Sequence, residues 1–188
     1  MPGAAWRAGE DEFLAGERVK LRSAVREAMG EFIGELAKPW SLFATLTFDP
    51  FAIGMAGADC EVTAERRAEL AVPAVSRWCA MRRFAYFLKH ASKAVGRPTV
   101  GVIALEPHMS GQPHGHGLLV TEGGVVGGDI SELSRLWRES RGNGWIRLEE
   151  PHSQQDVTSY CAKYMAKDAS ELVFSSALAR GATLGRTL

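Results

Sequence analysis

Two histidines, His114 and His116, stand two residues apart in the segment GQPHGHGLLV, at 111–120. If this segment is a β-strand, alternate side chains share a face, so both imidazoles project to one side and Gly115 to the other. Two imidazoles at that spacing can reach one metal ion. The pair alone is equally compatible with two packed or surface histidines, so the choice depends on the residues around it.

A carboxylate stands close to the histidine pair in the sequence. Glu106 ends the hydrophobic segment PTVGVIALE, 98–106, and a turn at 107–113 would bring it beside the two histidines. A carboxylate at the end of an apolar strand needs a partner. Two imidazoles and one carboxylate, with coordination positions left open, describe a catalytic site for a divalent metal ion. His108 is also near, but we place it in the turn rather than among the ligands.

A second group of reactive side chains lies in YCAKYMAK, at 160–167, where the unit Tyr-x-x-Lys occurs twice. On a helix, Tyr160 and Tyr164 stack on one face, and Lys163 and Lys167 lie on the adjoining edge. One interpretation is a helix with two core tyrosines and two solvated lysines. The other has an apolar stripe packed on the core and both tyrosines facing a cleft. There a metal ion that polarises a phosphate would provide a target for a tyrosine nucleophile.

Hydrophobic periodicity predicts the elements that would position these residues. Strands are expected at 41–48, 98–106, 114–120 and 144–150, and helices at 17–37, at 73–96, from 129 to about 140, and from Ser153 through 160–167. Pro73 suits a first helical turn, and Asp129 with Glu132 resembles a capping box. The order of elements predicts an α+β fold, with a central antiparallel β-sheet flanked by helices, of the ferredoxin-like or split βαβ kind.

The bulk composition is that of an ordinary globular chain. The sequence has 188 residues, 46% hydrophobic and 23% charged, which suits one domain. Apolar runs are too short for a membrane helix, and the N-terminus lacks the pattern of a signal peptide. The three cysteines (Cys60, Cys79 and Cys161) are scattered and form no CxxC spacing. We therefore expect a reduced, cytoplasmic protein that makes no contact with a membrane.

The charge is balanced overall but unevenly distributed. Lys and Arg total 22, as do Asp and Glu, which argues against a protein that coats nucleic acid nonspecifically. The stretch 66–97 is nevertheless strongly basic, and its candidate phosphate contacts are Arg77, Arg82, Arg83 and Lys89. Four tryptophans (Trp40, Trp78, Trp137 and Trp145) are candidates for base stacking, although we expect at least three of them in the core. No GxxxxGK[ST] pattern occurs, so nothing indicates an ATPase.

Taken in order, three motifs resemble those of the HUH-superfamily endonucleases, and specifically the two-tyrosine rolling-circle replication initiators, or Rep proteins. The motifs are FATLTF at 43–48, PHGHGLLV at 113–120 with Glu106 as the third ligand, and YCAKYMAK at 160–167. The tyrosines follow the histidine pair, as they do in Rep proteins and related transposases. One departure is Gly115, where the family has a bulky residue. Either another residue fills the face behind this strand, or a helix approaches it closely.

The resemblance implies a metal-dependent, sequence-specific endonuclease and strand transferase for single-stranded DNA, which initiates and terminates rolling-circle replication. Glu106, His114 and His116 would hold Mg²⁺ or Mn²⁺. Tyr160 and Tyr164 would attack DNA in turn, forming a 5′-phosphotyrosine, with Lys163 and Lys167 assisting the tyrosine that precedes each. If one tyrosine alone is essential, Tyr164 is the better candidate.

The resemblance also implies partners and boundaries. The partners would be single-stranded or hairpin origin DNA of a phage or plasmid, a host helicase and a DNA polymerase. Residues 1–38 would form an N-terminal helical extension, 39–170 the HUH endonuclease domain and 171–188 a C-terminal tail. The alternatives are an HUH transposase, an origin-binding module that does not nick, and a metallohydrolase that makes no use of tyrosine.

Overall fold

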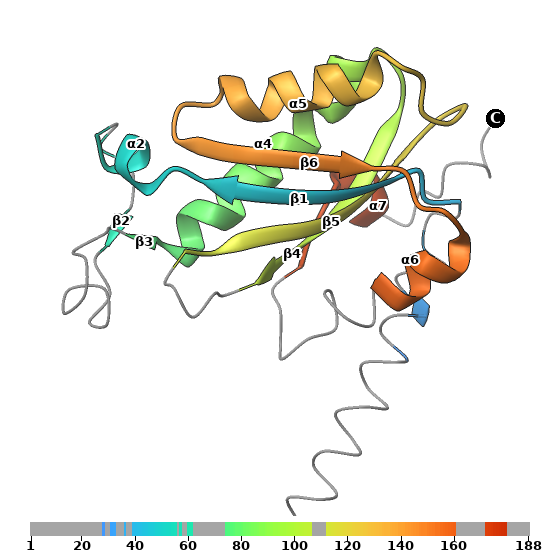
Figure 1. Ribbon diagram of the computed structural model, residues 1–188, viewed down its shortest axis with the longest axis horizontal. Coiled ribbons are helices and arrows are strands. Elements are labelled where there is room, and N and C mark those ends of the chain that lie inside the picture. The colour runs from blue at the N-terminus through green and yellow to red at the C-terminus, as the bar shows by residue number, and fades with distance from the viewer. Residues whose placement is uncertain are drawn as a thin grey trace, which may run out of the picture.

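The structure is a computed structural model. It describes residues 39–55, 57, 60–61, 74–106, 112–160 and 172–179, together with 28, 31, 32 and 36. The elements along the chain (Figure 1) are β1 (Leu42–Phe48), α2 (Pro50–Met55), β2 (Cys60–Glu61), β3 (Ala74–Val75), α4 (Arg77–Val95), β4 (Thr99–Glu106), β5 (His114–Thr121), α5 (Asp129–Glu139), β6 (Asn143–Glu149), α6 (Gln154–Tyr160), β7 (Leu172–Phe174) and α7 (Ser176–Ala179). The four strands expected from the sequence are present. Most of the expected helix at 17–37 lies outside the described residues.

A five-stranded sheet in the order β6-β1-β5-β4-β7 forms the centre of the fold, and every neighbouring pair in it is antiparallel. The unit β1-α4-β4 is split by β5, and the unit β5-α5-β6 is split by β1. Two interleaved βαβ units of this kind make the ferredoxin-like arrangement. The predicted α+β fold is therefore confirmed.

The sheet extends beyond the expected endonuclease domain. Strand β7 pairs with β4, with Ile103 opposite Val173, and the backbone N–H of Ser175 donates to the carbonyl of Gly101. Leu178 of α7 is buried in the same layer. The described part of 171–188 thus belongs to the folded domain rather than to a separate tail.

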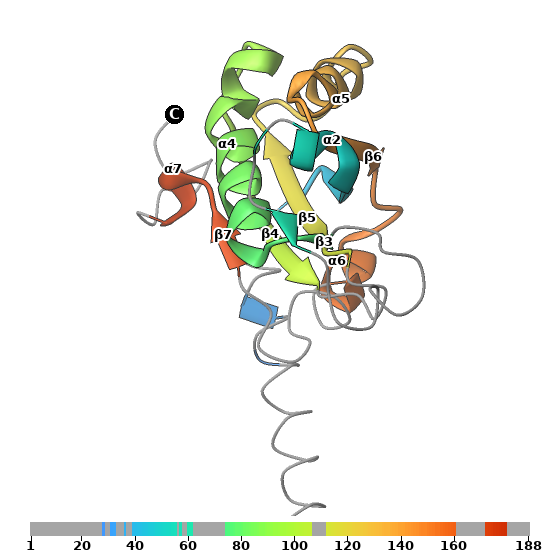
Figure 2. The same cartoon turned by 90° about the vertical axis from the view of Figure 1, so that its left-hand side faces the viewer.

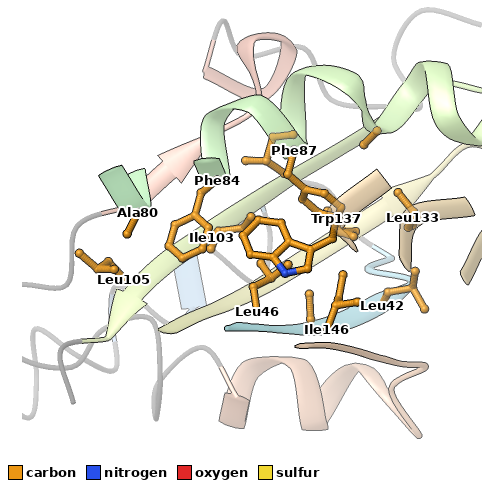
Figure 3. Packing of buried hydrophobic residues seen from close by; sticks show 14 of the residues in the cluster. Leu42, Leu46, Ala80, Phe84, Phe87, Ile103, Leu105, Leu133, Trp137 and Ile146 are labelled. Carbon is orange, nitrogen blue, oxygen red and sulfur yellow. The ribbon is translucent and has the colours of Figure 1, made fainter. Parts of the chain in front are cut away.

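Helices α4 and α5 cover one face of the sheet (Figures 1 and 2). Phe84, Phe87 and Trp137 fill the space between these helices and the strands (Figure 3), and each is at most 1% exposed. The strand positions that face them are Leu42, Ala44, Leu46, Ile103, Leu105, Leu119 and Ile146. Side chains of a strand alternate between faces, so the residues between these positions point to the other side.

The opposite face is covered only in part by described residues. Near the start of β1, Trp40 packs with Val157 of α6 and Leu178 of α7 against Val100 and Leu118 of the sheet. The other end of this face, where β4 ends and β5 begins, carries Glu106 and the two histidines. The fold therefore has a helix-covered face and an opposite face with polar side chains at one end.

One predicted helix start is wrong, and one predicted helix cap is absent. Helix α4 begins at Arg77, because Ser76 is its N-cap and accepts a hydrogen bond from the backbone N–H of Cys79, while residues 74–75 pair with β2. The expected capping box of α5 does not form either. The Asp129 carboxylate pairs with Arg97 and accepts the N–H of Val126, and no side chain caps the helix at Gly128.

The expectation that at least three of the four tryptophans lie in the core is wrong, because only two of them are buried. Trp40 and Trp137 are buried in the two hydrophobic layers, whereas Trp78 is 61% exposed and Trp145 is 53% exposed. The face of α4 that packs on the sheet includes Phe84, Phe87 and Leu88. Trp78 lies on a different face of this helix, which is open to solvent. The two exposed tryptophans lie on opposite sides of the sheet, because Trp145 alternates on β6 with Ile146 of the buried layer.

The missing side chain at Gly115 is explained by helix α4. A Cβ atom at Gly115 would lie 2.5 Å from Cζ of Phe84 and 2.9 Å from Cγ2 of Ile103. The aromatic ring of Phe84 therefore rests directly on the backbone of the histidine strand, and a helix does approach closely, as the glycine indicated. A side chain at 115 would displace the ring from a fully buried position.

We expect Gly115→Ala to lower the free energy of unfolding by about 1–3 kcal/mol, the usual range for overpacking a core. Combining it with Phe84→Leu, which removes the ring atoms in the way, should cost at least about 0.5 kcal/mol less than the sum of the two single changes. Urea unfolding measures both values. Gly127→Ala is the matched control, because nothing lies within 4 Å of a Cβ there. A Gly115→Ala protein as stable as the wild type would contradict this packing.

Candidate metal centre

The pairing of β4 with β5 brings Glu106, His114 and His116 together. Glu106 lies directly opposite His114 in the antiparallel register, and Ala104 lies opposite His116. The two histidines and Glu106 consequently share one face of two adjacent strands. Oε2 of Glu106 is 3.2 Å from Nε2 of His114 and 3.0 Å from Nε2 of His116. The expected three-residue cluster is thus present, with three potential ligand atoms directed at one point.

The spacing of these atoms fits a bound metal ion. Two ligand atoms about 2.1 Å from one ion and at right angles lie about 3 Å apart, close to the separations seen here. One ligand atom from each residue lies within 4.8 Å of the others. The side chains of Glu106, His114 and His116 are 13%, 21% and 11% exposed, so the cluster is sheltered yet reachable. Among the described residues, this is the group of histidine, cysteine and carboxylate side chains that could hold a metal ion.

The sheet holds the cluster rigidly from behind. Strand β5 lies between β1 and β4, so its backbone pairs on both sides, with Thr45 opposite His116 on β1. The Phe84 ring packs on the reverse side of Gly115. Ligands on paired strands hold their geometry better than ligands on loops. Two imidazole nitrogens and one carboxylate oxygen leave coordination positions open for water or a substrate oxygen.

Tyr160, at the end of α6, contacts the cluster through its hydroxyl group. Its Oη is 3.2 Å from Nδ1 of His116 and donates a 3.1 Å hydrogen bond to the carbonyl of Ala44. Its ring stacks on Phe43 with centroids 4.4 Å apart and an interplanar angle of 18°. The hydroxyl thus lies at Nδ1 of the His116 ring, whereas Nε2 of that ring faces Glu106.

Helix α6 is fastened to the sheet by its first turn. The Gln154 side chain accepts the backbone N–H of Trp40 and donates to the Trp40 carbonyl, both at 3.2 Å. Val157, one turn on, is 1% exposed and packs with Trp40. The hydroxyl of Ser153 accepts the N–H of Asp156 and so caps the helix at its start. These contacts set where Tyr160 meets the sheet, and no local sequence motif indicated the Gln154–Trp40 pair.

Several of the expected site residues cannot be placed. Tyr164, Lys163, Lys167 and the turn residue His108 all lie outside the described residues. Their expected roles remain predictions from the sequence.

The basic residues of α4 lie on the other side of the sheet from the cluster. Arg77, Arg82 and Lys89 are exposed there, on a helix that has no acidic residue. The Arg82 guanidinium stacks on the exposed Trp78 ring, 4.5 Å from its centroid. Arg83 instead donates to the carbonyl of Arg141 and to Oδ1 of Asn143, which joins α4 to the turn before β6. The structure therefore does not bring these candidate phosphate contacts together with the histidines.

Helix α5 carries one arginine that is paired with acidic residues of the same helix. Arg135 donates to Glu132 and Glu139 on the same helix. The hydrogen bonds to these two glutamates and the accompanying charge attraction raise the pKa of Arg135 above its ordinary value. Its charge is thus balanced locally.

Trp145 on β6 is one of the four tryptophans that the sequence offered for base stacking, and it is 53% exposed. It shares a face with the histidines, two strands away from β5, about 10 Å across the sheet. The hydroxyl of Thr47 accepts the backbone N–H of Trp145 and donates to its carbonyl. The alternation in GWIRLEE, with Ile146 and Leu148 on the buried side, was the signal that could have placed Trp145 outward.

Comparison with models of known protein families gives no match, and searches of curated proteins and of solved structures likewise find no match. Within the described residues, no helix combines the length and apolar character required to cross a membrane.

Removing any of the three candidate ligands should abolish most metal binding. We expect Glu106→Gln, His114→Ala and His116→Ala each to weaken Mn²⁺ binding by at least about 100-fold, because changes to residues around a metal site already cost 10- to 100-fold. Titration calorimetry measures the dissociation constants. His90→Ala, which alters a histidine stacked on Tyr86 of α4, should bind Mn²⁺ like the wild type. Three ligand variants with wild-type affinity would show that the metal does not bind here.

Proposed function

We propose that this protein is a metal-dependent endonuclease and strand transferase that nicks and rejoins single-stranded DNA at an origin of rolling-circle replication. The observation that supports this most is the convergence of Glu106, His114 and His116 at one end of the sheet, with a tyrosine-bearing helix packed beside them. That combination matches the order of motifs that resembles Rep proteins.

The proposed reaction is a transesterification. A tyrosine oxygen bonds to the scissile phosphorus while the bond from phosphorus to the 3′ oxygen breaks. The tyrosine loses its proton and the departing oxygen gains one, leaving a 5′-phosphotyrosine and a free 3′-hydroxyl. Mg²⁺ or Mn²⁺ at the cluster would stabilise negative charge that develops on the phosphate. Because the phosphodiester energy is retained in the protein–DNA link, rejoining needs no ATP.

The position of Tyr160 favours Tyr164 as the attacking residue. A nucleophile must reach a phosphate located on the side of the cluster where Nε2 of His116 points. The Tyr160 hydroxyl lies instead at Nδ1 and donates to the Ala44 carbonyl. We therefore assign the attack to Tyr164, four residues further along the sequence, with Lys167 as its assisting lysine. This departs from the expectation that Tyr160 and Tyr164 both attack.

The face of the sheet that carries the cluster is the proposed track for DNA. Trp145 and Arg147 of β6 both project from this face and are more than half exposed, and Arg147 forms an ion pair with Glu149 that a phosphate would have to replace. An exposed indole can stack on any unpaired base, and a guanidinium can contact phosphate. Single-stranded or hairpin-extruded DNA is the substrate because a stacked duplex offers no base to Trp145. The basic side of α4 would contact flanking DNA only, and duplex unwinding and synthesis would fall to a host helicase and polymerase.

A metallohydrolase that uses water is the second candidate. It is favoured by the same observation, because the one described tyrosine at the site has its hydroxyl committed to a backbone carbonyl. Such an enzyme would cut DNA without ever becoming attached to it. A transposase of the same superfamily would form the attachment but act on transposon ends.

A covalent adduct distinguishes these candidates. We expect the protein, incubated with Mn²⁺ and a library of single-stranded and hairpin DNA, to yield a protein–DNA adduct that survives denaturant. Tyr164→Phe should abolish the adduct and so should Glu106→Gln, whereas Tyr160→Phe should still form it when Mn²⁺ is raised.

The remaining outcomes of this assay are equally informative. Cleavage of the DNA without an adduct would show that the enzyme is a hydrolase and does not nick and rejoin DNA. Neither cleavage nor adduct with any DNA would contradict the proposed function. An adduct from the Tyr160→Phe, Tyr164→Phe double variant would exclude both tyrosines.

The two exposed tryptophans test the DNA track, because they lie on opposite faces of the sheet. We expect Trp145→Ala to weaken binding of single-stranded DNA about tenfold, since stacking on an aromatic ring contributes about 1–3 kcal/mol per base. Trp78→Ala should have a smaller effect. Fluorescence anisotropy of labelled DNA measures both affinities. A greater loss for Trp78 than for Trp145 would move the track to the α4 side.

A further inference from the structure

We infer that Tyr160 is a positioning residue of the metal centre, whose hydroxyl holds His116 in the tautomer that presents Nε2 to the metal. The inference rests on the metal centre of the proposed function and not on the nicking reaction. It gives Tyr160 a role distinct from nucleophilic attack.

The hydrogen-bond donors and acceptors around Tyr160 define the tautomer. A tyrosine hydroxyl has one proton, and a backbone carbonyl can only accept. At 3.1 Å from the Ala44 carbonyl, the Tyr160 hydroxyl uses its proton there. Its oxygen, 3.2 Å from Nδ1 of His116, must then act as acceptor, so Nδ1 carries a proton. A neutral imidazole protonated at Nδ1 has its lone pair on Nε2.

That lone pair is directed at the cluster. Nε2 of His116 is the atom 3.0 Å from Oε2 of Glu106, and Nε2 of His114 is 3.2 Å from the same oxygen. Histidines that bind metals generally donate their second ring N–H to an oxygen, which holds the ring and raises the basicity of the bound nitrogen. Here that oxygen belongs to a tyrosine, which in turn is tied to the backbone of β1.

The chain holds the Tyr160 hydroxyl in place from two directions. The ring stacks on Phe43 at 4.4 Å, and α6 is docked through Gln154 on Trp40 and through the buried Val157. Ala44 belongs to β1, the strand that pairs with β5 alongside His116. The hydroxyl oxygen that accepts from His116 is therefore held in place by contacts with both α6 and β1.

The phenylalanine variant tests this arrangement directly. Tyr160→Phe keeps the ring and its stacking on Phe43 and removes only the oxygen. In the metal-free protein the Glu106 carboxylate, 3.0 Å from Nε2 of His116, competes for a proton on that nitrogen, so the tautomer is measured in a Glu106→Ala background. Long-range ¹H–¹⁵N NMR of metal-free Glu106→Ala protein, at a pH where the imidazole is neutral, should show His116 protonated at Nδ1, and adding Tyr160→Phe should populate both tautomers. Mn²⁺ binding by the Tyr160→Phe single variant should weaken 10- to 100-fold, the range seen when such outer partners of a ligand are lost.

Tyr86→Phe is the matched control. Tyr86 is 51% exposed on α4 and contacts His90 rather than the cluster. Its variant should leave both the His116 tautomer and the Mn²⁺ affinity as in the wild type.

Two results would overturn the inference. One is a folded Glu106→Ala protein in which neutral His116 carries its proton on Nε2. The other is a folded Tyr160→Phe protein with unchanged Mn²⁺ affinity. Tyr160 would be the nucleophile instead if that variant lost the DNA adduct at every Mn²⁺ concentration while its metal affinity stayed normal. Failure of the wild type to form any adduct would contradict the nicking proposal alone, because the NMR and Mn²⁺ results do not depend on DNA.

Discussion

The antiparallel register between β4 and β5 is the constraint on which the candidate site depends. It places Glu106 directly opposite His114 and keeps His116 on the same face. A shift by one residue would turn the histidines toward α4 and the hydrophobic core. The register is enforced from the buried side, where Ile103, Leu105 and Leu119 must face the helices. The polar cluster is thus maintained by apolar packing on the opposite surface of the same strands.

The close packing behind β5 requires glycine at two positions of this strand. The Phe84 ring occupies the volume that side chains at Gly115 would need, and a Cβ at Gly117 would lie 2.9 Å from Ile103. Glycine in a strand interior sacrifices side-chain packing and conformational entropy. In return, an aromatic ring of a long helix supports the backbone directly beneath the two histidines. The space behind the histidines is therefore filled by a ring from another element rather than by a side chain of β5.

The sheet separates two surfaces of different chemistry. On the helix-covered side, α4 exposes arginines, lysines and Trp78 without any acidic residue on the helix. On the other side, the cluster, Tyr160 and the exposed Trp145 lie along β4, β5 and β6 and at the end of α6. A strand of DNA engaged at the proposed site would lie on the second surface, so the basic side chains of α4 are remote from the proposed chemistry.

Local patterns in the sequence determined which residues can act together, because strand and helix periods specify which side chains share a face. The alternation in HGHGLLV paired the histidines, the position of Glu106 at a strand end supplied the carboxylate, and the order of elements predicted the split βαβ sheet. The exposure of Trp78, the pairing of Asp129 with Arg97 and the addition of β7 were decided by tertiary structure. So was the contact between the Tyr160 hydroxyl and Nδ1 of His116. Each of these depends on a partner more than 20 residues away or on which face a neighbouring layer covers, and no local period carries that information.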